Sequence, residues 1–270
     1  MSFYTSLNGL KNAQTSLGVI AHNISNSETY GFKRSRTEFS EIVAGSALSN
    51  PRMIQGIGAS VSSITQNFAL GPIEQTGSAL DLAITGDGFF AKRSPVDGQT
   101  LYTRSGSFTM TGTGDIADSE GNRLQLFPVD ANGQVTSNTL GDAQIPAANA
   151  AGSELAGVTI TAEGVVQASY ADGSIEPVGA VALATFISPT GLKKVGSANW
   201  EGTGLSGAAT YGSPGSGAYG SLLSGALERS NVDIAEELVG LITAQRNFQA
   251  NAKAIDTATQ ISQTVINLRT

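Results

Sequence analysis

Apolar residues recur at alternating spacings of four and three near both ends of the chain, which places them on one narrow face of a helix. The N-terminal stripe consists of Phe3, Leu7, Leu10, Gln14, Leu17, Ala21 and Ile24. The C-terminal stripe consists of Ile234, Leu238, Leu241, Gln245, Phe248, Ala252 and Ile255. These two stripes, here called the seams, can be buried only against each other or against neighbouring copies of the chain. The pattern therefore indicates an assembly protein, and the matched polar breaks at Gln14 and Gln245 favour one register among copies.

The boundaries of both helices can be predicted from stop and start signals. The first helix is expected from about Phe3 to about Ser25, because the segment 26–31 ends in a glycine suited to a left-handed cap. The second is expected to begin after Asp233, which with Glu236 forms a D-x-x-E capping pattern, and to run to about Leu268. Beyond Ile255 its stripe shifts to Ala258, Ile261, Val265 and Leu268, a step that would overwind a regular coiled coil.

The middle of the chain is typical of short strands separated by turns. Turn signals occur at Asp87-Gly88, Asp97-Gly98, Glu120-Gly121-Asn122, Asn132-Gly133, Glu163-Gly164 and Asp172-Gly173. Strand-like stretches lie at 80–84, 88–91, 124–127, 158–160, 165–167 and 178–187. The predicted fold is α+β: residues 1–30 and 231–270 pair as a coiled-coil-like stalk, 31–70 form an extended or hairpin connector, and 71–230 form a central antiparallel β domain.

Several segments of lower complexity invite more than one interpretation. Phe32–Phe39 contains Lys33, Arg34 and Arg36, which fits either a solvated connector or a contact with acidic residues of a neighbouring subunit. Ile42–Ser60 is small, polar and rich in glycine, so a loop or extended hairpin is expected. Residues 147–152 and 202–220 are rich in alanine, glycine and serine and are predicted to be surface loop and linker. The seams themselves also allow an intramolecular helical hairpin packed on the β domain.

Composition excludes several classes of function. A net charge of −7 and a pI near 4.7 argue against nucleic acid or an anionic membrane as a partner, because phosphate neutralisation needs cationic surface. The absence of cysteine excludes disulfides and thiolate chemistry. The longest apolar runs are shorter than a bilayer crossing requires, and the first residues lack the features of a cleavable signal peptide.

Candidate catalytic chemistry is sparse. His22 is the only histidine and has no cysteine or second histidine with which to share a metal. Asp115, Asp118 and Glu120 resemble a calcium loop, but their spacing fits a turn better. The glycine-rich stretch 212–217 has no lysine for a phosphate. We therefore expect no catalytic residue, no cofactor and no metal site.

Four motifs resemble those of the axial proteins of the bacterial flagellum, the family of rod and hook subunits. Ala21–Lys33 resembles the N-terminal signature of that family, and Leu80–Phe90 and Tyr102–Phe108 resemble two strand motifs of its first β domain. Leu227–Asp233, continuing into 236–239 and 244–251, resembles its C-terminal signature. The residues of this chain that match the terminal motifs are Asn23, Asn26, Gly31, Phe32, Lys33 and Asn231.

The resemblance implies a subunit that polymerises into a tube, with its terminal helices lining the inner tube and its β domain forming the outer wall. It also implies export through the flagellar type III apparatus without a cleaved signal peptide, and contacts with adjacent axial proteins such as the distal rod, the hook–filament junction and the hook cap. The wording of residues 1–4, 26–33, 217–222 and 265–269 is more similar to hook subunits, whereas the short segment 128–174 is similar to distal rod subunits. The sequence thus favours a compact hook subunit that forms curved tubes, with a distal rod subunit and a secreted dimeric binding module as alternatives.

Overall fold

The structure is a computed structural model that describes residues 2–44 and 55–267. The part of the predicted connector around Asn50-Pro51, and Leu268 of the shifted stripe beyond Ile255, lie outside these residues. The described residues of the chain form two compact units, which are considered separately below. The first contains the described residues of Met1–Ser27, Arg34–Asn67 and Val232–Thr270, and the second contains Glu28–Lys33 and Phe68–Asn231.

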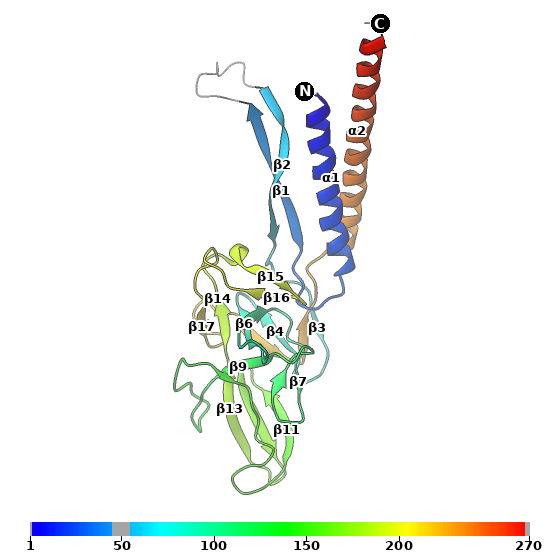
Figure 1. Cartoon of the computed structure of the whole chain (residues 1–270). Coiled ribbons are helices and arrows are strands. Elements are labelled where there is room, and N and C mark those ends of the chain that lie inside the picture. The colour runs from blue at the N-terminus through cyan, green and yellow to red at the C-terminus, as the bar shows by residue number, and fades with distance from the viewer. Residues whose placement is uncertain (1, 45–54, 268–270) are drawn as a thin grey trace. The chain divides into compact units, whose positions relative to one another are not determined.

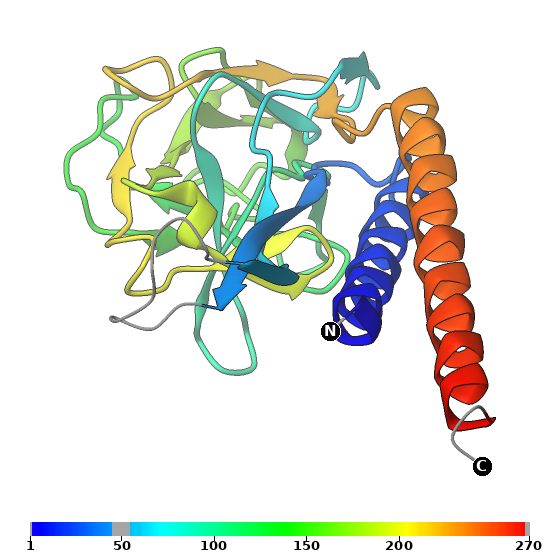
Figure 2. The ribbon, with the colours of Figure 1, turned by 90° about the horizontal axis from the view of Figure 1, so that it is seen from above.

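The first unit consists of two long helices and a two-stranded sheet. Helix α1 (Ser2–Ser25) and helix α2 (Ile234–Asn267) lie side by side and run in opposite directions, and strands β1 (Ser35–Ala44) and β2 (Gln55–Gln66) pair antiparallel beside α1 (Figures 1 and 2). Both predicted helices are confirmed to within about a turn at each end. The extended hairpin expected around residues 42–60 is confirmed where the structure describes it.

The start of α2 follows from its predicted cap. The Asp233 carboxylate accepts hydrogen bonds from the backbone N–H groups of Ala235 (2.8 Å) and Glu236 (3.2 Å). These donors have no partner inside the helix, so the cap stabilises it by about 1 kcal/mol. Among the described residues, no helix is both long enough and apolar enough to cross a membrane.

The second unit is an antiparallel β domain. Its main sheet contains 13 strands, eight of them in the order β11-β12-β13-β9-β5-β6-β16-β15, while β4 pairs with β18 and β3 with β19. The elements are β3 (Ile73–Gln75), β4 (Leu82–Thr85), β5 (Phe89–Arg93), β6 (Thr100–Thr103), β7 (Thr109–Met110), β8 (Ile116–Ala117), β9 (Arg123–Phe127), β10 (Gly141–Asp142), β11 (Leu155–Ile160), β12 (Val165–Tyr170), β13 (Ile175–Val181), β14 (Leu183–Thr185), η2 (Pro189–Gly191), β15 (Lys193–Gly196), β16 (Asn199–Glu201), β17 (Thr210–Gly212), β18 (Ser221–Ser224) and β19 (Ala226–Glu228). The predicted α+β class is therefore confirmed.

The β domain has hydrophobic clusters on both faces of strand β5, because successive side chains of a strand point to opposite faces. Phe90 packs in a cluster with Phe108 and Leu124, whereas Phe89 packs in another with Trp200 and Phe186. The ring centroids of Phe89 and Trp200 lie 5.8 Å apart, and those of Phe90 and Phe108 lie 5.6 Å apart, both in edge-to-face geometry. These aromatic pairs hold the β5–β6 hairpin at the centre of the domain.

Three predictions for the central domain are wrong. Asp87-Gly88 is not a hairpin turn, because β4 pairs with β18 while β5 pairs with β6. The single strand predicted over 178–187 is divided between β13 and β14, which pair with different strands. The predicted linker 202–220 contains β17, which pairs with β14. The pairings behind these errors join strands that are not neighbours in the sequence, β4 with β18, β14 with β5 and β17 with β14, and they leave no local signal.

Candidate assembly surface

The seams are not buried within the chain. Gln14, Ala21 and Gln245 are exposed, Phe3, Ile234 and Leu238 are between 42% and 48% exposed, and all other seam residues are half-buried. All fourteen residues lie in the described part of the chain. The seams are therefore not the buried contact between the two helices, and much of their apolar surface remains exposed to solvent.

Small and polar residues form the inner face of the helix pair instead. Ala13 and Ala244 are 7% and 6% exposed. A side-chain carbon at Gly9 would lie 2.4 Å from the Asn251 Oδ1 atom, so a larger residue there would displace the Asn251 side chain from its place between α1 and α2. Gly9, Ala13 and Ala244 each precede a seam residue by one position, so they lie on a neighbouring face of the helix. Because this face contacts the other helix, the seams face outward.

The inner face is incompletely filled. A groove of about 540 Å³ is lined by Ile20 and by small or polar residues of both helices, and by Phe39 and Ala59 of the β1–β2 hairpin. Asn12 Nδ2 donates a hydrogen bond to the Ala59 carbonyl at 2.7 Å and holds α1 to the hairpin. The first unit is thus held by a few specific polar contacts rather than by a close-packed apolar core.

Asn23, one of the family-motif residues, is 1% exposed and joins α1 to β1. Its Oδ1 atom accepts a hydrogen bond from the Ser35 backbone N–H (2.9 Å), and its Nδ2 atom donates to the Ser35 carbonyl (2.8 Å) and to Glu237 Oε2 (3.2 Å). The amide therefore satisfies both backbone groups of Ser35 as a paired strand would.

Arg34 fixes the start of α2 within the same unit. Its guanidinium forms a two-bond fork with the Glu236 carboxylate (2.9 and 3.0 Å), and its Nε atom lies 2.6 Å from Glu237 Oε1. The hydrogen bonds that Arg34 donates to Glu236 raise the pKa of Arg34 above its already high value, with the Glu237 charge adding to the shift. Asn23, Arg34 and Glu237 thus form one network that sets α1, β1 and α2 together.

In the β domain, Glu228 is the centre of a fully buried ionic cluster. Its Oε1 atom accepts hydrogen bonds from Lys33 Nζ (2.5 Å) and the Gly71 N–H (2.8 Å), and its Oε2 atom lies 3.5 Å from Arg104 Nη1. Burial lowers the pKa of Lys33 and of Arg104, although the Glu228 charge opposes both shifts. The Lys33 ammonium also donates to the Ala69 carbonyl at 2.8 Å.

The remaining family-motif residues have similar internal roles. Gly31 has φ +68°, and a side-chain carbon there would lie 2.3 Å from the Ser105 nitrogen. Phe32 is buried. Asn231 Nδ2 donates to the Ala69 carbonyl (3.0 Å), and Asn26 Nδ2 donates to the His22 carbonyl (2.9 Å) at the end of α1. All of the motif residues thus stabilise the fold of one chain.

The interpretation of residues 32–39 as a solvated connector, or as a contact with another subunit, is wrong for Lys33 and Arg34. Lys33 has no exposed side-chain surface, and Arg34 pairs with Glu236 and Glu237 of the same chain. Of the three cations, only Arg36 has an exposed side chain. The acidic partners of Lys33 and Arg34 lie about 200 positions away in the sequence, so local charge density could not identify them.

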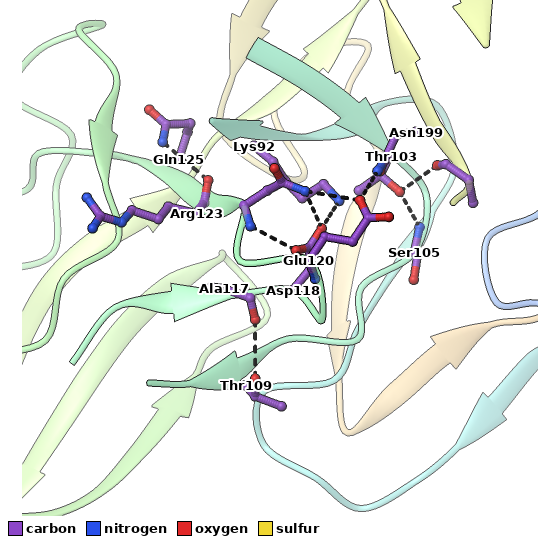
Figure 3. Close-up of polar contacts among 12 residues, drawn as sticks. Lys92, Thr103, Ser105, Thr109, Ala117, Asp118, Glu120, Arg123, Gln125 and Asn199 are labelled. Atoms are coloured by element: carbon purple, nitrogen blue, oxygen red, sulfur yellow. Dashed lines mark hydrogen bonds and ion pairs between the residues drawn. The ribbon is translucent and has the colours of Figure 1, made fainter. Parts of the chain in front are cut away.

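The acidic turn at residues 115–122 is structural, as its spacing predicted. Asp118 Oδ1 accepts hydrogen bonds from the Glu120 and Asn122 backbone N–H groups (2.9 Å each), and Oδ2 contacts Lys92 Nζ (Figure 3). Burial acts to raise the pKa of Asp118, but the hydrogen bonds from Lys92 and Asn122 and the Lys92 charge outweigh it and hold that pKa below its usual range. This carboxylate is fully used in closing the turn.

Sequence reasoning missed the inner face of the helix pair. Gly9, Ala13 and Ser16 on α1, and Gly240 and Ala244 on α2, repeat at spacings of three or four, as the seams do. This stripe of small residues is the signal that could have identified the contact, since small side chains permit close helix approach. The seams give the stronger sequence pattern because their side chains are larger and more apolar.

Comparisons with known proteins agree with the sequence motifs. Three family models match the chain: "Flagella basal body rod protein" over residues 3–33, "Flagellar hook protein FlgE/F/G D1 domain" over 83–168, and "Flagellar basal body rod FlgEFG protein C-terminal" over 223–268. The chain is 36% identical to the flagellar basal-body rod protein FlgG of Bacillus subtilis over 280 residues, covering 99% of this chain and 98% of that protein.

Two further relatives show how the match varies within the group. The flagellar basal-body rod protein FlgG of Caulobacter vibrioides is 35% identical over 282 residues, with 98% of both chains covered. The flagellar hook protein FlgE of Salmonella typhimurium is 27% identical, and its alignment extends over 411 residues with all of both chains covered. Because this chain has 270 residues, that alignment contains long gaps.

Proposed function

This chain belongs to the family of flagellar rod and hook proteins, and we propose that it polymerises as the distal rod subunit of the flagellar basal body. The family is a structural component of the flagellum rather than an enzyme family. In the proposed polymer, the terminal helices line the inner tube and the β domain forms the outer wall. The protein reaches this position by type III export and contacts the adjacent axial proteins.

The exposure of the seams is the observation that carries this proposal. A single chain leaves Leu238, Ile234 and Phe3 nearly half exposed while burying small residues between α1 and α2. Contact of such apolar stripes with water costs a free energy of about 25 cal/mol for each Å² of exposed surface. Packing the seams of neighbouring copies against each other would remove this surface from solvent.

The choice of rod over hook rests on length and identity. The rod relatives match this chain from end to end at 35–36% identity, whereas the alignment to the hook relative needs 411 positions. The amino-acid sequences of the segments 26–33 and 265–269 are more similar to hook subunits, so the hook remains the second candidate. A hook must bend as it turns, so the two candidates predict polymers of different shape.

Electron microscopy of polymers of the purified full-length chain tests both candidates. Straight tubes of short, fixed length are expected for a distal rod subunit, whereas curved tubes would transfer the assignment to the hook. Analytical ultracentrifugation of the same sample is the control for a third class, the secreted binding module. Assembly that ends at a dimer would exclude both axial functions.

A further inference from the structure

We propose that the Val96-Asp97 turn, at the tip of the β5–β6 hairpin, docks into a cavity at the base of the same hairpin in a second copy of the chain. The inference deepens the proposed function and rests on it, because it names one contact through which polymerising subunits recognise each other. Both surfaces belong to the β domain.

The cavity combines aromatic walls with a buried cation. It has a volume of about 380 Å³ and is lined by Phe68, Phe89, Phe186 and Arg104, among others. This volume lies in the range of sites that hold a small ligand or a few side chains. The Arg104 guanidinium carbon lies 5.4 Å from the centroid of the Phe89 ring, so the cation forms part of the wall rather than projecting into solvent.

Arg104 is the feature that calls for a ligand. It is 2% exposed, its Nε atom has no hydrogen-bond partner, and its one hydrogen bond within the described chain is the 3.5 Å contact with Glu228. A buried guanidinium with most of its donors unused is costly unless a further acceptor reaches it. The buried Lys33, Arg104 and Glu228 side chains carry two positive charges and one negative charge, and the nearest further anion is the exposed carboxylate of Asp87 at the cavity, which also attracts Arg104. An incoming carboxylate would thus meet a cation that the buried residues alone do not neutralise.

The tip of the hairpin supplies matching chemistry. Val96 is 94% exposed, the highest value among the exposed large hydrophobic side chains of the described chain. The neighbouring Asp97 is also exposed: its carboxylate accepts a long hydrogen bond of 3.4 Å from the Gln99 N–H, and hydrogen bonding by the Ser94 side chain and the Gln99 N–H keeps the pKa of Asp97 below its usual range, so the group is charged at neutral pH. An apolar side chain beside an exposed, charged carboxylate complements aromatic walls beside a guanidinium with unused donors.

The hairpin places these two surfaces at opposite ends. Phe89 begins β5, and Arg104 follows the end of β6 directly, so both lie at the base, whereas residues 94–99 form the tip. Five residues of extended strand separate base from tip by about 16 Å. The tip cannot fill the cavity of its own chain, so the contact must join two copies head to tail. Head-to-tail contacts that do not close into a ring generate open helical polymers, as the proposed function requires.

Disulfide trapping tests the contact, because the natural chain has no cysteine. We expect a mixture of Val96→Cys and Ala218→Cys chains to polymerise and, on oxidation, to give a covalent dimer on a non-reducing gel. Ala218 lines the cavity and is exposed. A mixture of Val96→Cys with Ile175→Cys, which places the second cysteine on the exposed start of β13, is the matched control and should give none. Polymers without the Val96–Ala218 cross-link, or with equal cross-linking in the control, would overturn the inference and leave the rod assignment standing.

A pair of isosteric charge changes tests the role of Arg104 without replacing a residue of the buried cluster. Asp97→Asn removes the carboxylate proposed to reach Arg104, and it should raise the critical concentration for polymerisation roughly tenfold, as expected for a lost charge-assisted hydrogen bond. Asp87→Asn removes an exposed carboxylate that lines the cavity itself, where it would repel the incoming Asp97, and it should leave the critical concentration unchanged or lower it. An unchanged critical concentration for Asp97→Asn, or equal effects of both variants, would contradict the proposal. If the natural chain formed no polymer at all, both the inference and the proposed function would fall.

Discussion

Replacing Glu228 by glutamine removes the only negative charge of the buried cluster that contains Lys33 and Arg104. Glutamine has nearly the same shape and keeps one oxygen that can accept the hydrogen bond of the Gly71 N–H, which lies 2.8 Å from the native carboxylate. The change therefore isolates the charge. It leaves two cations whose side chains are at most 3% exposed without their buried counter-ion.

The size of the effect follows from burial. Removing one partner of a buried ion pair typically costs about 3–5 kcal/mol, because the other charge is left uncompensated in a medium that solvates it poorly. Lys33→Met should cost less, about 1–3 kcal/mol, because Arg104 still balances Glu228 and the Ala69 carbonyl keeps its hydrogen bond from Asn231. The expected order of destabilisation is thus Glu228→Gln above Lys33→Met.

Chemical denaturation of the full-length chain, followed by the fluorescence of Trp200, measures both variants, since Trp200 is buried in the same domain. Glu74→Gln is the matched control: Glu74 is 47% exposed and lies 3.6 Å from Arg229, so its loss should cost less than about 1 kcal/mol. For a domain of this size, Glu228→Gln should lower Tm by about 6–20 °C. If Lys33→Met were as destabilising as Glu228→Gln, the charge count would not govern the cluster and the reasoning would be refuted.

Further predictions concern the seam, a glycine and pH. Leu238→Asp should abolish polymerisation in sedimentation assays while the β domain melts as before, because it places a charge on a half-exposed seam; loss of that melting transition would assign the residue to a core. Gly31→Ala should destabilise by several kcal/mol in thermal melts, since the new carbon would lie 2.3 Å from the Ser105 nitrogen at a positive φ, and a neutral result would disprove this steric account. Asp118→Asn should lower the free energy of unfolding by about 3 kcal/mol at pH 7. Because the pKa of Asp118 is lowered in the folded state, its charge stabilises the fold above the unfolded pKa near 4, and this stabilisation is lost as pH falls through the folded pKa. Thermal melts from pH 7 to pH 3 should therefore show a shrinking difference between the variant and the natural chain.

The helices could be predicted closely because their signals are local. A stripe with a fixed spacing, an Asp233 cap and a glycine stop each act within a few residues of the boundary that they define. The orientation of the helices was not predictable in the same way. A seam shows which face is apolar, but small residues such as Gly9 and Ala244 decide which face meets the other helix, since they permit the closer approach.

In the β domain, pairs of neighbouring strands could be predicted from the sequence, whereas pairs of strands far apart in the sequence could not. Hairpins such as β11–β12 and β12–β13 were predicted from their turns, because the turn itself sets the register. The pairs β4–β18 and β3–β19 join strands that are more than 100 positions apart. No turn chemistry encodes such pairs, and the same holds for the ion pair between Lys33 and Glu228.

The family-motif residues and the seam residues therefore act in different ways. Asn23 is buried and bonds to the backbone of β1 and to Glu237 within the helical unit, while Lys33 is buried against Glu228 within the β domain. The seams are open and varied in side chain. A polymer needs both properties, because the subunit must hold one shape while it presents surface to its neighbours. On this argument, substitutions at Asn23 or Lys33 should lower the stability of the free monomer, whereas substitutions at Leu238 should change assembly alone, and a variant that reversed this order would show that the two sets are not separate.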